Sequence, residues 1–555
     1  MKKNLRFISV LIAVICLTAF AFTGCGPTAT STVTELRVWN YDGGVGHEWL
    51  DEVIQRFEAE HATSVYEEGK QGVKITPLNT KDTNQLNNIK NANHSVYFAQ
   101  GIRYNGLQAD GTLLDISDLV DDTLPGEDKT IESKLSENTK AALSAQGGYY
   151  VLPHYQSFNG VVYNKTVFDE YGLYLDQNSK PVNYENRADK SLRSVGPDGI
   201  KGSDDDGLPS SIEEFGILLE YMVDSSIIPF IWADGNNKSY QMALTNALWL
   251  NLEGYDGAMA NFTFNSNGTT SRIVTEYNAD GTPKTVVEKE ITKENIWEVY
   301  QQESRYYALE MSEKVFSNED YYHKYSTSST NSQTLIQQTF LESNFTGEKP
   351  IAMMLEGSYW LNEAKAANKY QEAVGNYAGV ADLEFRMMPL PIIAKGSVKE
   401  GEGRQPVHLD MLSSYAFINA NVTSKHGEGV ANLAKDFLKY CYTDISLAKF
   451  TEKSNVTKDV SYDLSDKQYN DLGSFAKSVW DAKKNDKVLV PISGEAEFVK
   501  NPSEFTMFSD LVLWKTTAGD GTPYPYTGFH SMGLSAGEYF KGLQKTQEWW
   551  NKLKH

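Results

Sequence analysis

The chain has 555 residues, of which 51 are Lys or Arg and 73 are Asp or Glu, so its formal net charge at pH 7 is −22. A body this acidic repels phosphate backbones and anionic lipid headgroups, which excludes nucleic-acid binding and adhesion to an anionic membrane surface. With three cysteines in all, Cys16, Cys25 and Cys441, stability has to come from large apolar cores, and a chain of this length predicts two or more lobes.

The N-terminal segment has the pattern of a bacterial lipoprotein leader. Lys2, Lys3 and Arg6 precede an uncharged apolar run over residues 7–22, and small residues then lead to Cys25. The run lies near the lower length limit for a membrane span, and a cationic end before a short apolar core is typical of a cleaved signal. We expect cleavage directly before Cys25 and lipidation of this cysteine, palmitate included. An uncleaved membrane anchor is the alternative.

A short tether is expected between the lipid and the body of the protein. After the predicted signal peptide, residues 1–24, the stretch over residues 25–34 is rich in Gly, Pro, Ser and Thr and carries no charge. Such a segment cannot bury apolar surface and is predicted to be flexible. The remaining chain is therefore expected to be extracytoplasmic, attached to the outer face of the cell membrane through its lipid alone.

The first 150 or so residues alternate between strand-like and helical segments. Residues 36–40 alternate as a strand, a glycine-rich loop follows, and Trp49, Val53, Ile54 and Phe57 recur at helical spacing. Further strand-like runs lie at residues 73–75, 96–99 and 113–116. Strands alternating with helices predict a largely parallel sheet covered on both faces.

The rest of the chain continues this pattern around two polar insertions. The strand-like runs over 148–155 and 161–164 flank a polar bend, where a first crossing between lobes is expected. The insertions cover residues 176–210 and 256–294, the second with the turn signals of a hairpin. Further predicted elements are a helix over 294–315, strands over 350–355 and 385–391, an amphipathic helix over 432–442 that buries Cys441, and a terminal helix over 538–550.

Several segments carry a family resemblance through their order as well as their content. They are residues 57–58, 111–116, 149–155, 162–165, 353–360, 388–391 and 434–440. Together they resemble the family 1 extracellular solute-binding proteins, which capture sugars for ABC importers and share the fold of maltose-binding protein. The likeness thins beyond about residue 450.

The resemblance implies an α/β, two-lobed fold of the periplasmic-binding-protein type 2 class, with three interlobe crossings and a ligand cleft. We expect lobe 1 to contain residues 35–153 and 346–420. Lobe 2 is expected to contain residues 154–345 and 421–555, with the two polar insertions on it. Such a cleft shuts around its ligand as the crossings bend.

A sugar site needs flat aromatic rings for the C–H faces of the sugar and planar polar groups for its hydroxyls. Ligands of open α/β sheets lie off the carboxyl ends of strands, which here are followed by such residues. The candidate ligand-binding residues are Trp39, Tyr41, Asp42 and Gly43 after the first strand, Tyr155 and Gln156 at the first crossing, Trp232 and Asp234, Glu356, Ser358 and Trp360 in the turn that resembles the family's, and Phe529.

Structural roles are the alternatives for these residues. Tyr41 and Asp42 also fit a turn before a helix, and Tyr155 and Gln156, with His154 beside them, also fit buried packing at a hinge. A core tryptophan is the alternative for Trp232.

An acidic loop in the first insertion predicts a calcium site. Its carboxylates are interspersed with glycines that let a loop wrap a hard cation. The expected ligands are Asp198, Ile200, Ser203, Asp204 and Asp206. The spacing is not that of an EF-hand, because Gly202 stands where the first acidic ligand belongs. A solvated acidic turn is the alternative, and any calcium here would be structural.

Three segments begin like enzyme motifs, but each lacks residues that the motif requires. His47-Glu48 lacks the second His of a zinc-protease helix, and Gly44-Val45-Gly46 lacks the third Gly of a dinucleotide fingerprint. The turn Gly357-Ser358-Tyr359-Trp360 lacks the flanking glycines of a nucleophile elbow. We therefore expect no enzyme activity and no cofactor requirement.

The function predicted from sequence is that of an extracellular substrate-binding lipoprotein of an ABC transporter. It would capture a neutral sugar or oligosaccharide between its lobes, deliver it to the permease subunits and act as a monomer. A secreted glycoside hydrolase, in which Glu356 and Asp42 flank the glycosidic bond, is one alternative. A stand-alone surface glycan-binding protein and a receptor for a polyol or another small solute are the others.

Overall fold

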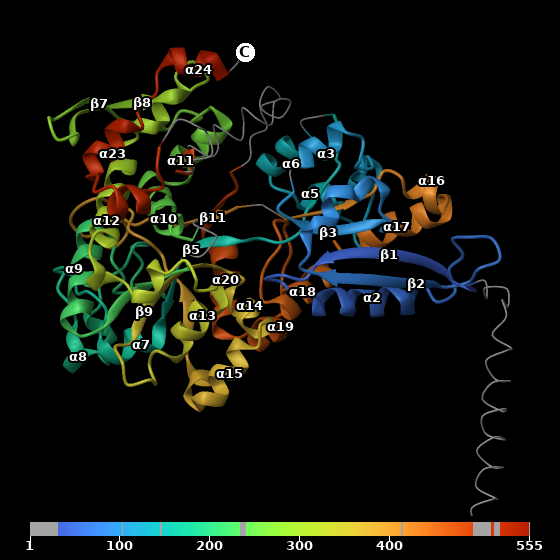
Figure 1. Cartoon of the computed structure of the whole chain (residues 1–555), viewed down its shortest axis with the longest axis horizontal. Coiled ribbons are helices and arrows are strands. Elements are labelled where there is room, and N and C mark those ends of the chain that lie inside the picture. Colours follow the sequence, from blue (N-terminus) through green and yellow to red (C-terminus); the bar gives the residue numbers. More distant parts are fainter. Residues whose placement is uncertain are drawn as a thin grey trace, which may run out of the picture.

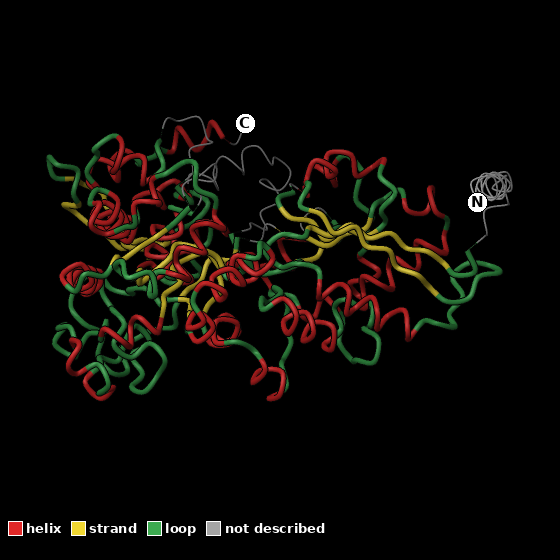
Figure 2. The backbone as a smooth tube through the Cα atoms, turned by 60° about the horizontal axis from the view of Figure 1, so that its bottom comes forward, coloured by secondary structure: helices red, strands yellow, loops and turns green. Residues whose placement is uncertain are grey.

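The computed structural model describes residues 31–102, 104–144, 147–233, 240–411, 414–491, 512–514 and 522–553. These residues form two α/β lobes that lie side by side (Figure 1). Each lobe has its own mixed sheet, and the two groups of strands stand apart in Figure 2. The predicted two-lobed α/β fold is confirmed. Cys25 and the predicted tether up to residue 30 lie outside the described residues.

The first lobe is built on a five-stranded mixed sheet. Its strands in spatial order are β2 (Val73–Thr80), β1 (Thr34–Tyr41), β3 (Val96–Gln100), β12 (Ser414–Ile418) and β4 (Leu152–Pro153). β1 is parallel to both neighbours, whereas β12 is antiparallel to β3 and β4. In the first half of β1, Leu36 and Val38 are buried and Glu35 and Arg37 are exposed, as expected where one face of a strand is covered.

The second lobe is built on a six-stranded sheet. Its strands are β13 (Lys487–Leu489), β11 (Val407–Asp410), β5 (Phe158–Asn164), β9 (Ile351–Gly357) and β6 (Ile228–Ile231) in spatial order, with β10 (Phe385–Met387) also paired to β5. Every residue of β9 is buried. Met353 and Met354 pack into two different cores on opposite faces of the sheet, which explains the uninterrupted apolar run of this strand.

Amphipathic helices close the core of the first lobe. They are α2 (Glu48–Glu60), α3 (Tyr104–Ala109), α4 (Ser117–Asp121), α5 (Ile131–Lys134), α6 (Glu137–Leu143), α16 (Val422–His426), α17 (Glu428–Tyr440) and α18 (Asp444–Ser454). Phe57 of α2 meets Phe437 of α17 edge to face, with ring centroids 5.3 Å apart. Cys441 follows α17 as a free, buried thiol whose pKa burial raises to about 12, so its predicted core role is confirmed.

Helices cover both faces of the second sheet. They are α7 (Lys165–Tyr171), α8 (Asn183–Asn186), α9 (Ile212–Asp224), α10 (Met242–Glu253), α11 (Tyr255–Thr263), α12 (Glu303–Phe316), α13 (Gln333–Glu342), α14 (Trp360–Ala366), α15 (Lys369–Asn376), α20 (Ser474–Asn485), α23 (Ala536–Gly542) and α24 (Gln547–Leu553). The predicted helix over 294–315 is broken at Gln302 into a 3-10 turn (Ile296–Gln301) and α12. Across the described ranges no helix has the length and apolar character needed to cross a bilayer.

The second predicted insertion, residues 256–294, contains a hairpin. The strands β7 (Thr270–Tyr277) and β8 (Pro283–Glu290) pair as an antiparallel hairpin, as the turn signals predicted. The start of that stretch is not an insertion, because α11 buries Ala258, Met259 and Phe262 in the core of the second lobe.

The chain crosses between the lobes three times. It passes from β4 to β5, returns from β11 to β12, and leaves again after α18. The third passage includes α19 (Asp466–Asp471) and ends in α20, where Trp480 packs in the core of the first lobe and Val479 in that of the second. The predicted number and order of crossings agree with this path.

The predicted lobe boundaries after residue 345 are wrong. β9 and β10 were assigned to lobe 1 through the range 346–420, but both pair with β5 in the second sheet. The return to lobe 1 comes only at β12, and α16, α17 and α18, assigned to lobe 2 through the range 421–555, pack in the first lobe. A buried strand has the same apolar pattern in either sheet, so its sequence does not tell which sheet it joins.

A buried arginine ties α12 to the C-terminal part of the second lobe. Arg305 is fully buried and donates hydrogen bonds to the carbonyl oxygens of Val299 and Val512 and to Asn261. We expect Arg305→Met to lower the free energy of unfolding by roughly 3–5 kcal/mol, because three buried acceptors lose their donor. The exposed Arg272, paired with Glu303 at 2.6 Å, provides the control: Arg272→Met should cost less than about 1 kcal/mol. Scanning calorimetry of both variants measures the difference, and equal losses would contradict this account.

Candidate functional site

The junction of the lobes carries the loop that follows β1. Tyr41 ends this strand, and Asp42 begins the loop that leads to α2. The ring of Tyr41 folds over Gly43, where a Cβ would lie 2.7 Å from the tyrosine hydroxyl. Gly44 has a φ of +50°, and a Cβ there would lie 3.3 Å from the ring of Tyr359, which belongs to the second lobe. The glycines thus allow the first lobe to touch the second.

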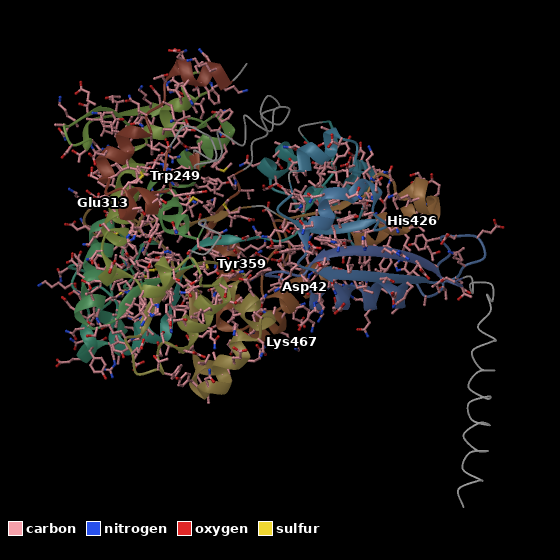
Figure 3. All side chains as sticks on the ribbon, in the orientation of Figure 1. Asp42, Trp249, Glu313, Tyr359, His426 and Lys467 are labelled. Atoms are coloured by element: carbon pink, nitrogen blue, oxygen red, sulfur yellow. The ribbon has the colours of Figure 1, made fainter. Side chains whose placement is uncertain are left out.

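The second lobe places polar and aromatic side chains opposite this loop. Glu356 lies in β9, Tyr359 directly precedes α14, and Glu363 lies one turn into that helix. Tyr359 packs against the core of the first lobe, and Figure 3 labels it and Asp42 on the two sides of the junction. Gln337 of α13 donates to Glu356 Oε1 at 2.9 Å and to Glu363 Oε2 at 2.8 Å.

Two more tyrosines complete this group. Tyr240 donates a hydrogen bond to the hydroxyl of Tyr359, and Tyr155, at the first crossing, donates to Gln100 of the first lobe. Burial is the first cause that raises the pKa of each of these phenols, and the charge of Glu363 adds to it. We call the set of Tyr41, Tyr155, Tyr240, Glu356, Tyr359, Glu363 and Gln337 the interlobe site.

One carboxyl of the interlobe site is held near neutrality. Burial, and next the charge of Glu363, raises the pKa of Glu356 to about 8. The backbone N–H of Gly357 and the amide of Gln337 oppose this shift by donating to the carboxylate. In contrast, Asp42 faces His47, with Oδ1 3.1 Å from Nδ1, and this hydrogen bond raises the pKa of the imidazole.

Gln156 and Ser358 serve the joint between the lobes. Gln156 accepts a hydrogen bond from Thr457 at 2.7 Å, and its backbone N–H donates to the carbonyl of the same residue. The hydroxyl of Ser358 accepts from the backbone N–H of Phe158 at 3.2 Å. Both are buried. The contacts of Gln156 are those of a residue packed at the hinge, which is the structural alternative given for it above. Ser358 links the end of β9 to β5.

A lysine is buried where the first and third crossings meet. The Nζ atom of Lys458 lies 2.8 Å from the carbonyl oxygen of His154 and 3.0 Å from its Nδ1. The rings of Phe450 and Trp49 lie 4.2 and 5.2 Å from the same atom. Burial lowers the pKa of Lys458 to about 7, and burial and this lysine lower that of His154.

Four predicted ligand-binding rings are core residues, which corrects their assignment. Trp39 stacks on Tyr97 in the first lobe, and Trp232 contacts Phe316, Tyr322 and Tyr526 in the second. Each of these two rings is fully buried, Trp39 near the end of β1 and Trp232 directly after β6, so neither offers a face to a ligand. The other two corrections are Trp360, packed among Phe340, Phe385 and Phe475, and Phe529, packed on Tyr539.

Of the predicted residues, Tyr41, Tyr155 and Glu356 belong to the interlobe site, and Asp42 and Gly43 follow Tyr41 in the loop after β1. Asp234 lies outside the described residues. Sequence reasoning missed Tyr240, Gln337, Tyr359 and Glu363. One signal was available: Tyr359 stands between the named Ser358 and Trp360. Glu356, Ser358 and Trp360 were named because this turn resembles the family's, and the turn lies beyond the end of β9 at Gly357, where the side-chain period is no longer two.

The carboxylates of the acidic loop have hydrogen-bond or ion-pair partners within the protein. Asp198 accepts from the N–H of Ile200 and Asp206 from that of Gly202, while Asp204 pairs with Arg386 at 2.6 Å. Ser203 donates to the buried Asp205, whose pKa burial raises to about 7. The loop borders a cavity of about 510 Å³. Among the described residues no group of three or more His, Cys, Asp or Glu side chains converges to hold a metal ion. Calcium binding at this loop stays a prediction.

Two α/β lobes on three crossings, with polar and aromatic groups from both lobes at the junction, define the class of binding proteins that close around a ligand. Residues 43–446 match the profile of the bacterial extracellular solute-binding proteins. The chain belongs to this family, which confirms the resemblance seen in the sequence. Membership implies a location outside the cytoplasm.

Solved structures share this fold at low sequence identity. A protein described with xylan utilization by the thermophilic bacterium Caldanaerobius polysaccharolyticus is 14% identical, with a TM-score of 0.52 over 92% of this chain and 99% of the other. A chitin oligosaccharide binding protein is 16% identical, with a TM-score of 0.51 over 93% and 99%. The apo-form of RafE from Streptococcus pneumoniae is 14% identical, with a TM-score of 0.50 over 94% and 100%. No curated protein matches this chain.

The buried lysine at the joint makes a prediction about pH. Because the pKa of Lys458 is lowered to about 7 on folding, the unfolded chain binds more protons than the native one between about pH 7 and pH 10. The free energy of unfolding contributed by this group therefore rises with pH in that window. We expect Lys458→Met to flatten the rise by up to about 1.4 kcal/mol per pH unit.

Urea unfolding at several pH values measures this slope. Lys467→Met is the matched control, because Lys467 is exposed and pairs with Asp471 on the surface. Its slope should equal that of the wild type. An unchanged slope in Lys458→Met would show that this lysine is protonated in the folded protein throughout the window.

Proposed function

We propose that the protein is the sugar-binding subunit of an ABC importer, held at the outer face of the cell membrane by a lipid on Cys25. It captures a sugar or oligosaccharide between its lobes and presents the closed form to the permease subunits. The observation that carries the proposal is the interlobe site, in which four tyrosines, two carboxyl groups and one amide from both lobes lie together.

The chemistry of this site suits a sugar. Flat aromatic rings cover the C–H faces of a pyranose, while carboxyl, amide and phenol groups offer the donors and acceptors that its hydroxyls need. Family membership and the saccharide named for the chitin oligosaccharide binding protein support the same ligand class. No covalent step is required of any side chain.

Capture follows from the position of the site. Tyr41 belongs to the first lobe, whereas Glu356 and Tyr359 belong to the second. A ligand that contacts both sets gains its full binding energy only when the lobes are together, so it shifts the population towards the closed form. The permease then distinguishes loaded from empty receptor by the relative position of the lobes.

The proposal predicts measurable sugar binding that depends on the tyrosines of the junction. Isothermal titration against a panel of neutral mono- and oligosaccharides is expected to identify a binder. Tyr41→Ala or Tyr359→Ala should then weaken the affinity for this sugar roughly ten- to a hundredfold, because each substitution removes a ring on which the sugar can stack. The exposed Tyr184 on α8 provides the matched control, and Tyr184→Ala should bind as the wild type does.

Two outcomes would contradict this function. Binding of a peptide or an inorganic anion with no sugar binding would change the ligand class. Release of shorter products from a bound oligosaccharide would instead identify an enzyme.

The lipid anchor is tested by its cysteine. In cells fed with labelled palmitate, the wild-type protein should carry label and remain with the membrane fraction. Cys25→Ala should lose the label, because the proposed lipid is attached to this cysteine. The buried Cys441 provides the control, since Cys441→Ala should still be labelled. Labelling of Cys25→Ala would place the lipid elsewhere.

A further inference from the structure

The centre of the interlobe site is rich in acceptors. Gln337 is fully buried and spends both amide hydrogens, one on Glu356 and one on Glu363. Its own oxygen, Oε1, is buried and has no hydrogen-bond partner. The carboxylates of Glu356 in β9 and Glu363 in α14 thus share the amide nitrogen of Gln337, and the oxygen of the same amide has no donor. A buried acceptor without a donor costs free energy, so this arrangement points to a missing donor.

Among the described residues, no positively charged side chain forms an ion pair with these carboxyl groups. The partners of Glu356 are the amide of Gln337 and the backbone N–H of Gly357, and those of Glu363 are the amides of Gln337 and Gln333. Within the described residues, no Lys, Arg or His contributes to the pKa shift of Glu356. The other titratable neighbours are the phenols of Tyr240 and Tyr359, which are neutral.

Two adjacent carboxyl groups in a buried site cannot both ionise without compensation. The protein alone resolves this by keeping a proton on the pair, which the raised pKa of Glu356 expresses. A cation bound to the two groups resolves it equally well, and the unpartnered Oε1 atom of Gln337 is a further acceptor for it. A metal ion fits poorly, because the described residues supply no third acidic or histidine ligand. An ammonium group needs three acceptors, and three are present.

We propose that the ligand presents a protonated amine to Glu356, Glu363 and the Oε1 atom of Gln337, so that the interlobe site binds an amino sugar. This rests on the proposed function, because it names the class of sugar that the same site takes. A neutral hydroxyl donates one hydrogen and leaves the second carboxyl uncompensated. An acidic sugar adds a further negative charge to a site without a described positive one and is excluded.

The proton balance follows from the same contacts. Before binding near pH 7, the pair of carboxyl groups holds one proton, because the pKa of Glu356 is about 8. An ammonium ligand stabilises both carboxylates, so this proton leaves to solvent and about one proton is released for each ligand bound. A neutral sugar leaves the proton in place, and its binding releases none.

Matched sugars test the proposal in the wild-type protein. Glucosamine, galactosamine and mannosamine, and their oligosaccharides, are titrated beside their N-acetylated and hydroxyl counterparts, which differ at carbon 2 alone. Titrations at pH 6.5 in buffers of different ionisation enthalpy count the protons released. We expect the amino form of the bound sugar to bind roughly ten- to a hundredfold more tightly than its neutral counterpart, with about one proton released.

A charge-removing variant gives the second measurement. E363Q keeps the size of the side chain and removes one charge, so the preference for the amine and the released proton should both disappear. E220Q is the matched control, because Glu220 is exposed and pairs with Lys314 away from the junction. It should keep the wild-type preference.

The outcomes separate the two claims. Equal or tighter binding of the neutral sugar without proton release would overturn the amino-sugar inference and leave the sugar-binding function standing. Absence of binding by every sugar in the panel would overturn both.

Discussion

The three crossings form one joint because their buried backbone groups are satisfied by one another. In the first crossing, His154 N–H donates to the carbonyl of Ser414 in the second, at 3.0 Å, and Gln156 N–H donates to that of Thr457 in the third, at 2.7 Å. Buried N–H groups have to find acceptors, so none of the three passages can adopt this conformation without the other two. The relative position of the lobes, and therefore the interlobe site, depends on this joint.

The site also depends on the pairing of β5 with β9. Gly160 lies opposite Glu356 in this antiparallel register, and the backbone of Phe158 exchanges hydrogen bonds with Ser358 just beyond the strand. The chain leaves the sheet at this point, and Tyr359 turns to the core of the first lobe. A slip of one residue would exchange the two faces of β9 and break the hydrogen bonds between Phe158 and Ser358 that hold the turn before Tyr359. Register in one lobe thus sets the contact with the other.

Sequence patterns identified the strands and part of the site for a physical reason. Tyr41 and Asp42 were found because ligand groups follow the carboxyl ends of strands, a rule that needs only the strand end. Trp39 and Trp360 were misassigned because large aromatic rings suit a packed core as well as a sugar face, and only burial distinguishes the two. Tyr240 and Gln337 come from segments with no motif of their own. The fold brings them to the junction, so no local pattern could show them.

Burial acts on the joint and on the interlobe site in the same direction. It lowers the pKa of Lys458 at the joint and raises that of Glu356 at the site, so both groups shift towards their neutral forms as the lobes pack. Both groups lie in an environment of low polarity. In such an environment a charged group of a ligand interacts more strongly than it would in water. Discrimination between sugars then depends on the few buried polar groups that face the ligand, because the net charge of the chain is screened by solvent.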